Sequence, residues 1–201
     1  SIDVVGTSQK FIFKRGTKIN KPPKFNKSIK ASLFVRTTML HPTIMIRSEF
    51  IKNKNLKYSS EYKYIEDYLY FLEICFKGGN FANIHSVQDN YNFKEKKNWE
   101  LHHDENISLA NKAISKIVLK SIDMELSKEN IHYLEILSSR KKIKSIKELF
   151  KIIVFIVHSS KNLNGKYGGF IFFYFERLKD ILLLIKIHIN RCLNNIFKHS
   201  L

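Results

Sequence analysis

The sequence predicts an α/β protein in which the latter part of a mixed sheet, with flanking helices, is followed by an all-helical tail. Short segments rich in β-branched and aromatic residues recur up to residue 91. They flank one strongly periodic helical segment, and beyond residue 106 helical periods with capping residues follow. We therefore expect two parts, residues 1–106 with the sheet and residues 107–201 as a helical extension.

The first 23 residues contain two short apolar segments typical of β-strands, Ile2–Val5 and Phe11–Phe13. A basic loop follows them and ends at Pro22-Pro23. Asn26 is a residue type that caps helices, so the sequence predicts a short helix over Ser28–Val35.

The segment His41–Arg47 predicts a buried strand. Pro42 favours extended geometry in the residue before it, and β-branched residues follow. Ser48 then has the residue type to cap a helical turn over Glu49–Lys52.

Residues 62–77 show the clearest helical period, because their apolar side chains fall on one face and Gly78-Gly79 supplies a C-terminal stop. Phe81–Ile84 and Val87–Tyr91 predict extended segments, and residues 92–106 a charged loop.

Three helices are predicted in the second part. Asn106 is expected to cap Ile107–Ser121, Ser127 to cap Lys128–Leu137, and the capping box Ser145-x-x-Glu148 to open Ile146–His158. Residues 168–201 are strongly apolar but charged throughout. This tail could pack in the core, pair with the preceding helix, or lie in a membrane interface with its lysines toward anionic head groups.

The composition narrows the function classes. The formal net charge is +17, but residues 61–106 carry 5 basic and 9 acidic side chains between two basic flanks. Of the 35 basic residues 29 are Lys, whereas bidentate recognition of phosphate or guanine favours Arg, so we do not expect nucleic-acid binding. Cys75 and Cys192 form no CxxC motif, and we expect a reducing cytoplasm. No apolar stretch is long enough to cross a membrane.

The adjacent carboxylates Glu66 and Asp67 are the first candidates for chemistry. Neighbours on a helix point about 100° apart, so one of them can face a cleft while the other does not. A carboxylate there can act as a general base if burial or a like charge raises its pKa. The alternative is a solvated helix face on which Lys63 pairs with Asp67 four residues later.

The histidines give weaker signals. His41 is either a structural histidine or a substrate contact. His102 and His103, with the acidic residues after them, have metal-ligand side chains, yet consecutive residues rarely converge on one metal and a solvated loop is favoured. No GxSxG, GxGxxG or HExxH motif occurs.

Taken in order, several segments resemble the C-terminal half of a bacterial family 2 glycosyltransferase with a GT-A fold. The resemblance covers about residues 1–110, and its most specific parts are the HPTIMIR segment and the helix that begins with Glu66-Asp67. The matching segments are Ser1–Thr7, Pro22-Pro23, His41–Arg47, Tyr64–Leu72 and Gly79–Ile84.

This resemblance implies transfer of a sugar from a nucleotide-sugar donor, of the UDP-sugar type, to a hydroxyl of a cell-surface glycan or lipopolysaccharide, with inversion at the anomeric carbon. It implies Asp67 as the catalytic base and Glu66 as the residue that orients or tunes it. It also implies substrate contacts for His41, Thr43 and Arg47, and a site at the inner face of the cell membrane.

The complete family member uses Mg²⁺ or Mn²⁺, held by an Asp-x-Asp motif in a nucleotide-binding half that precedes the matched region. No Asp-x-Asp occurs in this chain. Family members often place a histidine after the last strand, near the donor phosphates, and His102 or His103 could supply it as a metal ligand. We therefore expect the 201 residues to be part of a transferase that is inactive without the other half. The alternative is a non-catalytic module that binds a membrane surface or a protein through the basic tail.

Overall fold

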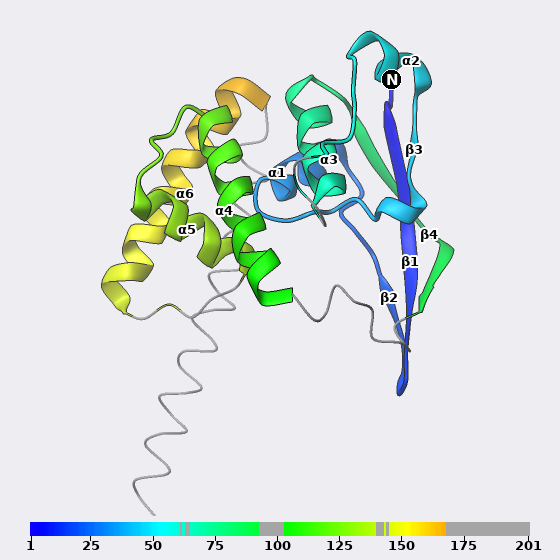
Figure 1. Ribbon diagram of the computed structural model, residues 1–201, viewed down its shortest axis with the longest axis horizontal. Helices are drawn as coiled ribbons and strands as arrows, with labels where there is room; N and C mark the ends of the chain where they lie inside the picture. The colour runs from blue at the N-terminus through cyan, green and yellow to red at the C-terminus, as the bar shows by residue number, and fades with distance from the viewer. Residues whose placement is uncertain (61, 63–64, 93–102, 140–142, 144, 168–201) are drawn as a thin grey trace, which may run out of the picture.

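The computed structural model describes residues 1–60, 62, 65–92, 103–139, 143 and 145–167 (Figure 1). These residues form a four-stranded sheet, the helices that pack beside it, and a group of three helices from the second part of the chain. The predicted α/β class, with a mixed sheet followed by helices, is confirmed over this part of the chain.

β1 (Val4–Phe13) is the central strand of the sheet. β4 (Phe81–Asn92) runs parallel to it along one edge. β2 (Gly16–Asn20) and β3 (Met45–Ile46) both run antiparallel to β1, β2 at its C-terminal end and β3 at its N-terminal end. Because β4 occupies one edge of β1, these two short strands share the other edge.

Two predicted strands, Ile2–Val5 and Phe11–Phe13, belong to the single strand β1, and the predicted basic loop contains β2. The prediction was wrong because the residues between the two apolar segments are polar, yet they pair with β4, and Ser8 and Gln9 are buried. Gly16 has a φ of +129°, which lets the chain turn directly into β2. β4 likewise joins its two predicted segments across irregularities in the pairing.

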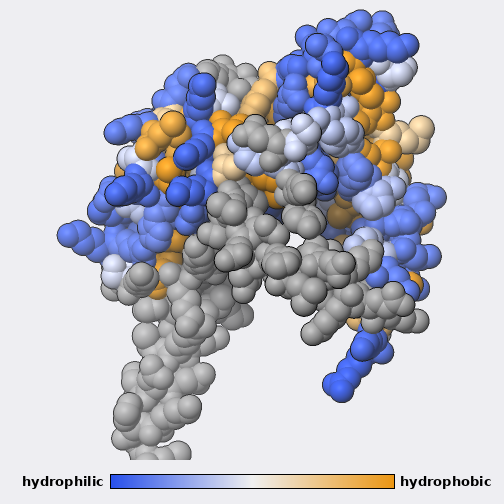
Figure 2. Space-filling model, viewed as in Figure 1, coloured by the Kyte–Doolittle hydropathy of each residue, from blue (hydrophilic) through white to orange (hydrophobic). Residues whose placement is uncertain are grey.

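The predicted buried strand over His41–Arg47 was also wrong. Residues His41–Thr43 form a 3-10 turn (η1), and only β3 after it is extended. Pro42 suits the first turn of a helix because the missing N–H has no partner to lose there. β3 lies at a partly open edge, where large exposed apolar side chains include Ile2 and Met45. Figure 2 shows apolar side chains gathered in that region.

α1 (Asn26–Leu33) packs against β4 and against α3 (Glu66–Phe76), and the buried residues of these elements form one core. Asn26 is the first residue of α1 and not its cap, because Phe25 has the cap position. The Asn26 carboxamide instead donates to Asn80 Oδ1 (2.9 Å) and accepts from the Phe81 amide (2.9 Å), which fixes α1 to the start of β4.

α2 (Ser48–Asn53) begins one residue before the predicted turn, and Ser48 lies inside it while Arg47 has the cap position. α3 begins at Glu66, later than predicted, and its stop is confirmed. Gly78 has a φ of +86°, and the Gly79 amide donates to the Ile74 carbonyl (2.9 Å).

The second part contains α4 (His103–Ser121), α5 (Lys128–Ser139) and α6 (Ile146–Tyr167). α4 begins before Asn106, so Asn106 is not its cap, and the predicted boundary between residues 106 and 107 falls within this helix. α6 continues nine residues beyond its predicted end at His158, to Tyr167. In Figure 1 the three helices lie together beside α1 and α3, away from the sheet.

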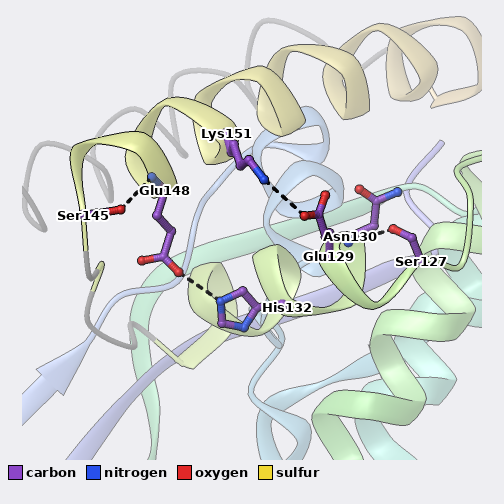
Figure 3. Close-up of polar contacts among 7 residues, drawn as sticks. All are labelled: Ser127, Glu129, Asn130, His132, Ser145, Glu148 and Lys151. Carbon is purple, nitrogen blue, oxygen red and sulfur yellow. Dashed lines mark hydrogen bonds and ion pairs between the residues drawn. The ribbon is translucent and has the colours of Figure 1, made fainter.

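The predicted caps of the last two helices are confirmed (Figure 3). The Asn130 amide donates to Ser127 Oγ, and the Glu148 amide donates to Ser145 Oγ, each at 3.1 Å. The Glu148 carboxylate also lies 3.0 Å from His132 Nε2, which joins α6 to α5. The predicted tail, residues 168–201, lies outside the described residues. Among the helices that are described, none combines the length and the apolarity that a membrane span requires.

Candidate active site

Asp67 lies in the first turn of α3, where its carboxylate is partly buried. Its Oδ1 accepts a hydrogen bond from the Tyr68 amide at 2.7 Å. Burial raises the pKa of Asp67, while the Tyr68 amide and the charge of His41 lower the pKa and the neighbouring Glu66 carboxylate raises it. The net direction is upward, which is unusual at a helix N-terminus, where the dipole favours a negative charge.

Glu66, the first residue of α3, is exposed. The structure therefore separates the two carboxylates as the helical geometry predicts: Asp67 turns toward the protein and Glu66 toward solvent. Lys63, the partner of Asp67 in the alternative interpretation, lies outside the described residues.

His41, in η1, is the charged group that reaches Asp67 from another element. Its Nε2 lies 3.0 Å from the hydroxyl of Tyr58, in the loop after α2. The imidazole also packs against the Phe71 ring in a tilted arrangement, with centroids 6.2 Å apart and ring planes 56° apart. The structure thus brings together His41 and Asp67, which the sequence had suggested separately.

Tyr58 and Tyr70 form a stacked pair beside these groups. Their ring centroids are 4.1 Å apart and the ring planes differ by 15°. Tyr70 belongs to α3 and is 4% exposed, whereas Tyr58 is 49% exposed. Burial raises the pKa of both phenols, and for Tyr58 the charge of Asp67 adds to that effect. Both hydroxyls therefore stay protonated at neutral pH and can donate hydrogen bonds.

Thr43 fixes the position of the η1 turn. Its hydroxyl donates to the Leu40 carbonyl (2.9 Å) and accepts from the Thr7 amide (3.1 Å). The turn that carries His41 is thereby anchored to β1. These contacts give Thr43 a positioning role, and the substrate contact that the resemblance implied for it stays a prediction.

Arg47 contacts the start of β1. Its Nη2 donates to the Ile2 carbonyl (2.7 Å), and its Nε lies 3.5 Å from Asp3 Oδ1. The other oxygen of Asp3 accepts from the Asn80 amide (2.9 Å). These contacts tie Arg47 to the start of β1, and the substrate contact that the resemblance implied for Arg47 stays a prediction.

The structure does not describe the side chains of the predicted metal ligands, His102 and His103. His102 lies outside the described residues, and for His103 the structure gives only its place as the first residue of α4. Over the described residues, no group of three or more His, Cys, Asp or Glu side chains could hold a metal ion.

Tyr58 and Tyr70 are the members of this cluster that sequence reasoning missed. Tyr70 could have been found, because it lies three residues after Asp67 and residues at that spacing share a helix face. Tyr58 carries no periodic signal, since it lies in a polar loop and its ring is placed by contact with Tyr70.

No family model, no curated protein and no solved structure matches this chain. What the site can do must therefore be argued from its own groups. The imidazole of His41 and the phenol of Tyr70 contact Tyr58, and the charge of Asp67, whose pKa is raised, acts on the Tyr58 phenol. Such groups can bind a hydroxyl and remove its proton.

Proposed function

We propose that this chain is the acceptor-side part of an inverting glycosyltransferase of the hexosyltransferase type. It would transfer a sugar from a nucleotide-sugar donor, of the UDP-sugar class, to a hydroxyl of a cell-surface glycan or lipopolysaccharide. The observation that carries this proposal is the Asp67 carboxylate, partly buried in the first turn of α3, with a raised pKa and with His41 beside it. The resemblance of the HPTIMIR and Glu66-Asp67 segments supports it.

In this reaction Asp67 is the general base. As the acceptor oxygen forms its bond to the anomeric carbon, Asp67 takes the hydroxyl proton, and the bond from that carbon to the donor diphosphate breaks on the opposite face. The electron pair of that bond leaves with the nucleoside diphosphate, and the anomeric configuration inverts. General-base help of this kind contributes about 10²–10⁴ in rate.

The residues around Asp67 set its proton affinity. The charge of His41 favours the carboxylate form, whereas burial and the Glu66 carboxylate favour the protonated form. The balance raises the pKa of Asp67, which strengthens the carboxylate as a base.

The resemblance also implies Mg²⁺ or Mn²⁺ on the donor diphosphate. Mg²⁺ prefers an octahedral set of oxygen ligands that includes carboxylates and phosphates. Here the partly buried Asp67 stands apart from the exposed Glu66, and the 201 residues contain no Asp-x-Asp. These residues do not fit a diphosphate-bound metal, so we assign no step of the reaction to one and expect the donor site in a segment outside them.

The test is an activity assay on the longest open reading frame that contains this segment, with a panel of radiolabelled UDP-sugars and mixed glycan acceptors. Asp67→Asn should reduce transfer at least about 10²-fold, because the amide cannot accept the proton. Asp123→Asn is the matched control, since it makes the same chemical change in the turn after α4, where Asn also tolerates the positive φ of 53°.

Two results would contradict the proposal. Near-normal transfer by Asp67→Asn would exclude Asp67 as the base. Absence of transfer with every donor, from a folded protein that does contain an Asp-x-Asp segment, would exclude the transferase.

The second candidate, a non-catalytic interaction module, is favoured by one surface of the helical part. A groove of about 610 Å³ lies between α5 and α6, and beside it Phe150 and Val154 are 66% and 52% exposed. Sedimentation with anionic vesicles, and analytical ultracentrifugation without them, test this surface. If it binds lipid or a second copy, Phe150→Ser with Val154→Ser should abolish that binding and leave sugar transfer unchanged.

A further inference from the structure

Tyr58 is held as a fixed platform although it lies in a loop. One face of its ring stacks on the buried Tyr70 at 4.1 Å, and its hydroxyl is 3.0 Å from His41 Nε2. The His41 ring also meets the Tyr58 ring edge-on, with centroids 5.8 Å apart. These contacts leave 49% of Tyr58 exposed. An aromatic ring that is fixed on one side and open on the other presents a flat apolar surface to a ligand.

Polar groups lie at the edge of this platform. The charge of Asp67 acts on the Tyr58 phenol, so the carboxylate lies within electrostatic reach of the ring. A carboxylate has about four lone-pair positions, and backbone amides use only part of them in Asp67. The exposed His41 can donate or accept according to its tautomer. The ligand that fits therefore has an apolar face and hydroxyl groups at its edge.

The local charge distinguishes anionic ligands from neutral sugars, both of which can stack on an aromatic ring. Nucleotides and sugar phosphates are anionic, and the two carboxylates of Glu66 and Asp67, which outnumber the single charge of His41, would repel them. Among the described residues no Lys or Arg forms an ion pair with either carboxylate. A neutral pyranose has no such penalty, and its hydroxyls can donate to Asp67 while its C–H groups cover the ring.

We infer that the open face of Tyr58 binds the ring of a neutral pyranose, with Asp67 and His41 at its hydroxyl edge. As the acceptor subsite this inference rests on the proposed function, but the binding of the sugar can be measured without any transfer. It makes the acceptor a neutral sugar, and it excludes a lipid phosphate or a phosphorylated sugar at this position.

The experiment is saturation-transfer-difference NMR on the 201-residue chain with methyl glycosides of glucose, galactose and N-acetylglucosamine at about 10 mM, a range suited to millimolar affinity. We expect the saturation to reach the C–H protons of one ring face in at least one glycoside. Tyr58→Leu should weaken that binding about tenfold, the loss typical of removing an aromatic stacking partner. Tyr58→Phe keeps the ring and should stay within about twofold. Tyr91→Leu, on β4, is the matched control and should have no effect.

Glucose 1-phosphate tests the charge argument and should bind more weakly than methyl glucoside. Equal or tighter binding of the phosphate would overturn the neutral-sugar inference, as would unchanged glycoside binding by Tyr58→Leu or no binding of any of the three glycosides. The ¹H–¹⁵N spectrum of Tyr58→Leu shows whether the variant is folded, and Tyr58→Gln, which also removes the ring but is polar enough for an exposed loop, repeats the test if it is not.

The outcomes also separate this inference from the proposed function. Glycoside binding that depends on Tyr58, without sugar transfer by the longer protein, would support the subsite and contradict the transferase. Transfer whose acceptor KM is unchanged by Tyr58→Leu would support the transferase and overturn the subsite.

Discussion

The hydroxyl of Tyr68 joins the start of α3 to the end of α1, and its removal should lower the free energy of unfolding of residues 1–92. It donates to the Leu33 carbonyl at 2.6 Å, and Tyr68 and Leu33 are 7% and 0% exposed. Leu33 is the last residue of α1, where helix carbonyls have no partner within the helix. Tyr68→Phe keeps the aromatic packing and deletes only this donor.

The expected loss can be estimated from burial. A hydrogen bond contributes about 0.5–1.5 kcal/mol net, and a buried acceptor left without its partner raises the cost to about 1–3 kcal/mol. Tyr58→Phe is the matched control, because its hydroxyl bonds the exposed His41 and the two groups can bond water instead. That deletion should cost less than about 0.5 kcal/mol.

Urea unfolding followed by far-UV circular dichroism measures both variants. Tyr68→Phe should lower the midpoint without a change in slope, since the surface exposed on unfolding is the same. Equal midpoints for the two variants would refute the assignment of this hydroxyl as a tie between the helices.

Three further predictions concern single residues. The pKa of Asp67 is higher in the folded state than its usual 3.8, so the folded state holds the proton more tightly than the unfolded state does. The ionised carboxylate therefore lowers the free energy of unfolding at every pH above the folded pKa. Asp67→Asn should therefore unfold at the same or higher urea concentration than the natural protein at pH 7, with the difference disappearing as the pH falls toward 3.8; a clear destabilisation at pH 7 would contradict the pKa direction. A Cβ at position 79 would lie 2.5 Å from Ile74 Cγ2 and 3.0 Å from the Ile74 carbonyl oxygen, so Gly79→Ala should cost about 1–3 kcal/mol in the same titration, and a neutral result would show that the end of α3 can shift. Burial raises the pKa of Cys75 to about 12, so iodoacetamide at pH 8 should leave this thiol unmodified in the native protein and label it in urea, as peptide mass mapping would show; native labelling would place Cys75 outside the core.

Sequence signals that act within one turn predicted the structure best. Ser127 and Ser145 cap their helices as predicted because a side-chain oxygen needs only the amide three residues later. The stop of α3 at Gly78 has the same local character. Asn26 has a capping residue type but is used elsewhere, because β4 brings Asn80 and Phe81 to its carboxamide. Contacts across the chain override local preference there.

The sheet was predicted less well for the same reason. Polar residues of β1 and β2 become strand because they pair with neighbours, and no local period identifies them. In the HPTIMIR segment Pro42 could favour either an extended residue before it or the first turn of a helix. The bonds of Thr43 to Leu40 and Thr7 select the turn, and Thr7 lies 36 residues away in the sequence.

The candidate site shows the same division. Helical geometry separates Asp67 from Glu66, and that could be read from the sequence. The neighbours of Asp67 could not be read from the sequence, because His41 comes from a 3-10 turn before α2 and Tyr58 from a loop after α2.

The direction of the Asp67 pKa is what favours function over structure at this position. A carboxylate in the first turn of a helix normally stabilises the fold through the dipole and through backbone amides, and both effects lower its pKa. Here burial outweighs the Tyr68 amide and the charge of His41, so the ionised form is disfavoured by the folded protein. A serine or an asparagine could accept the same amide hydrogen bond without burying a charge. The charge itself therefore contributes nothing favourable to stability, as expected if Asp67 has the general-base role proposed for it.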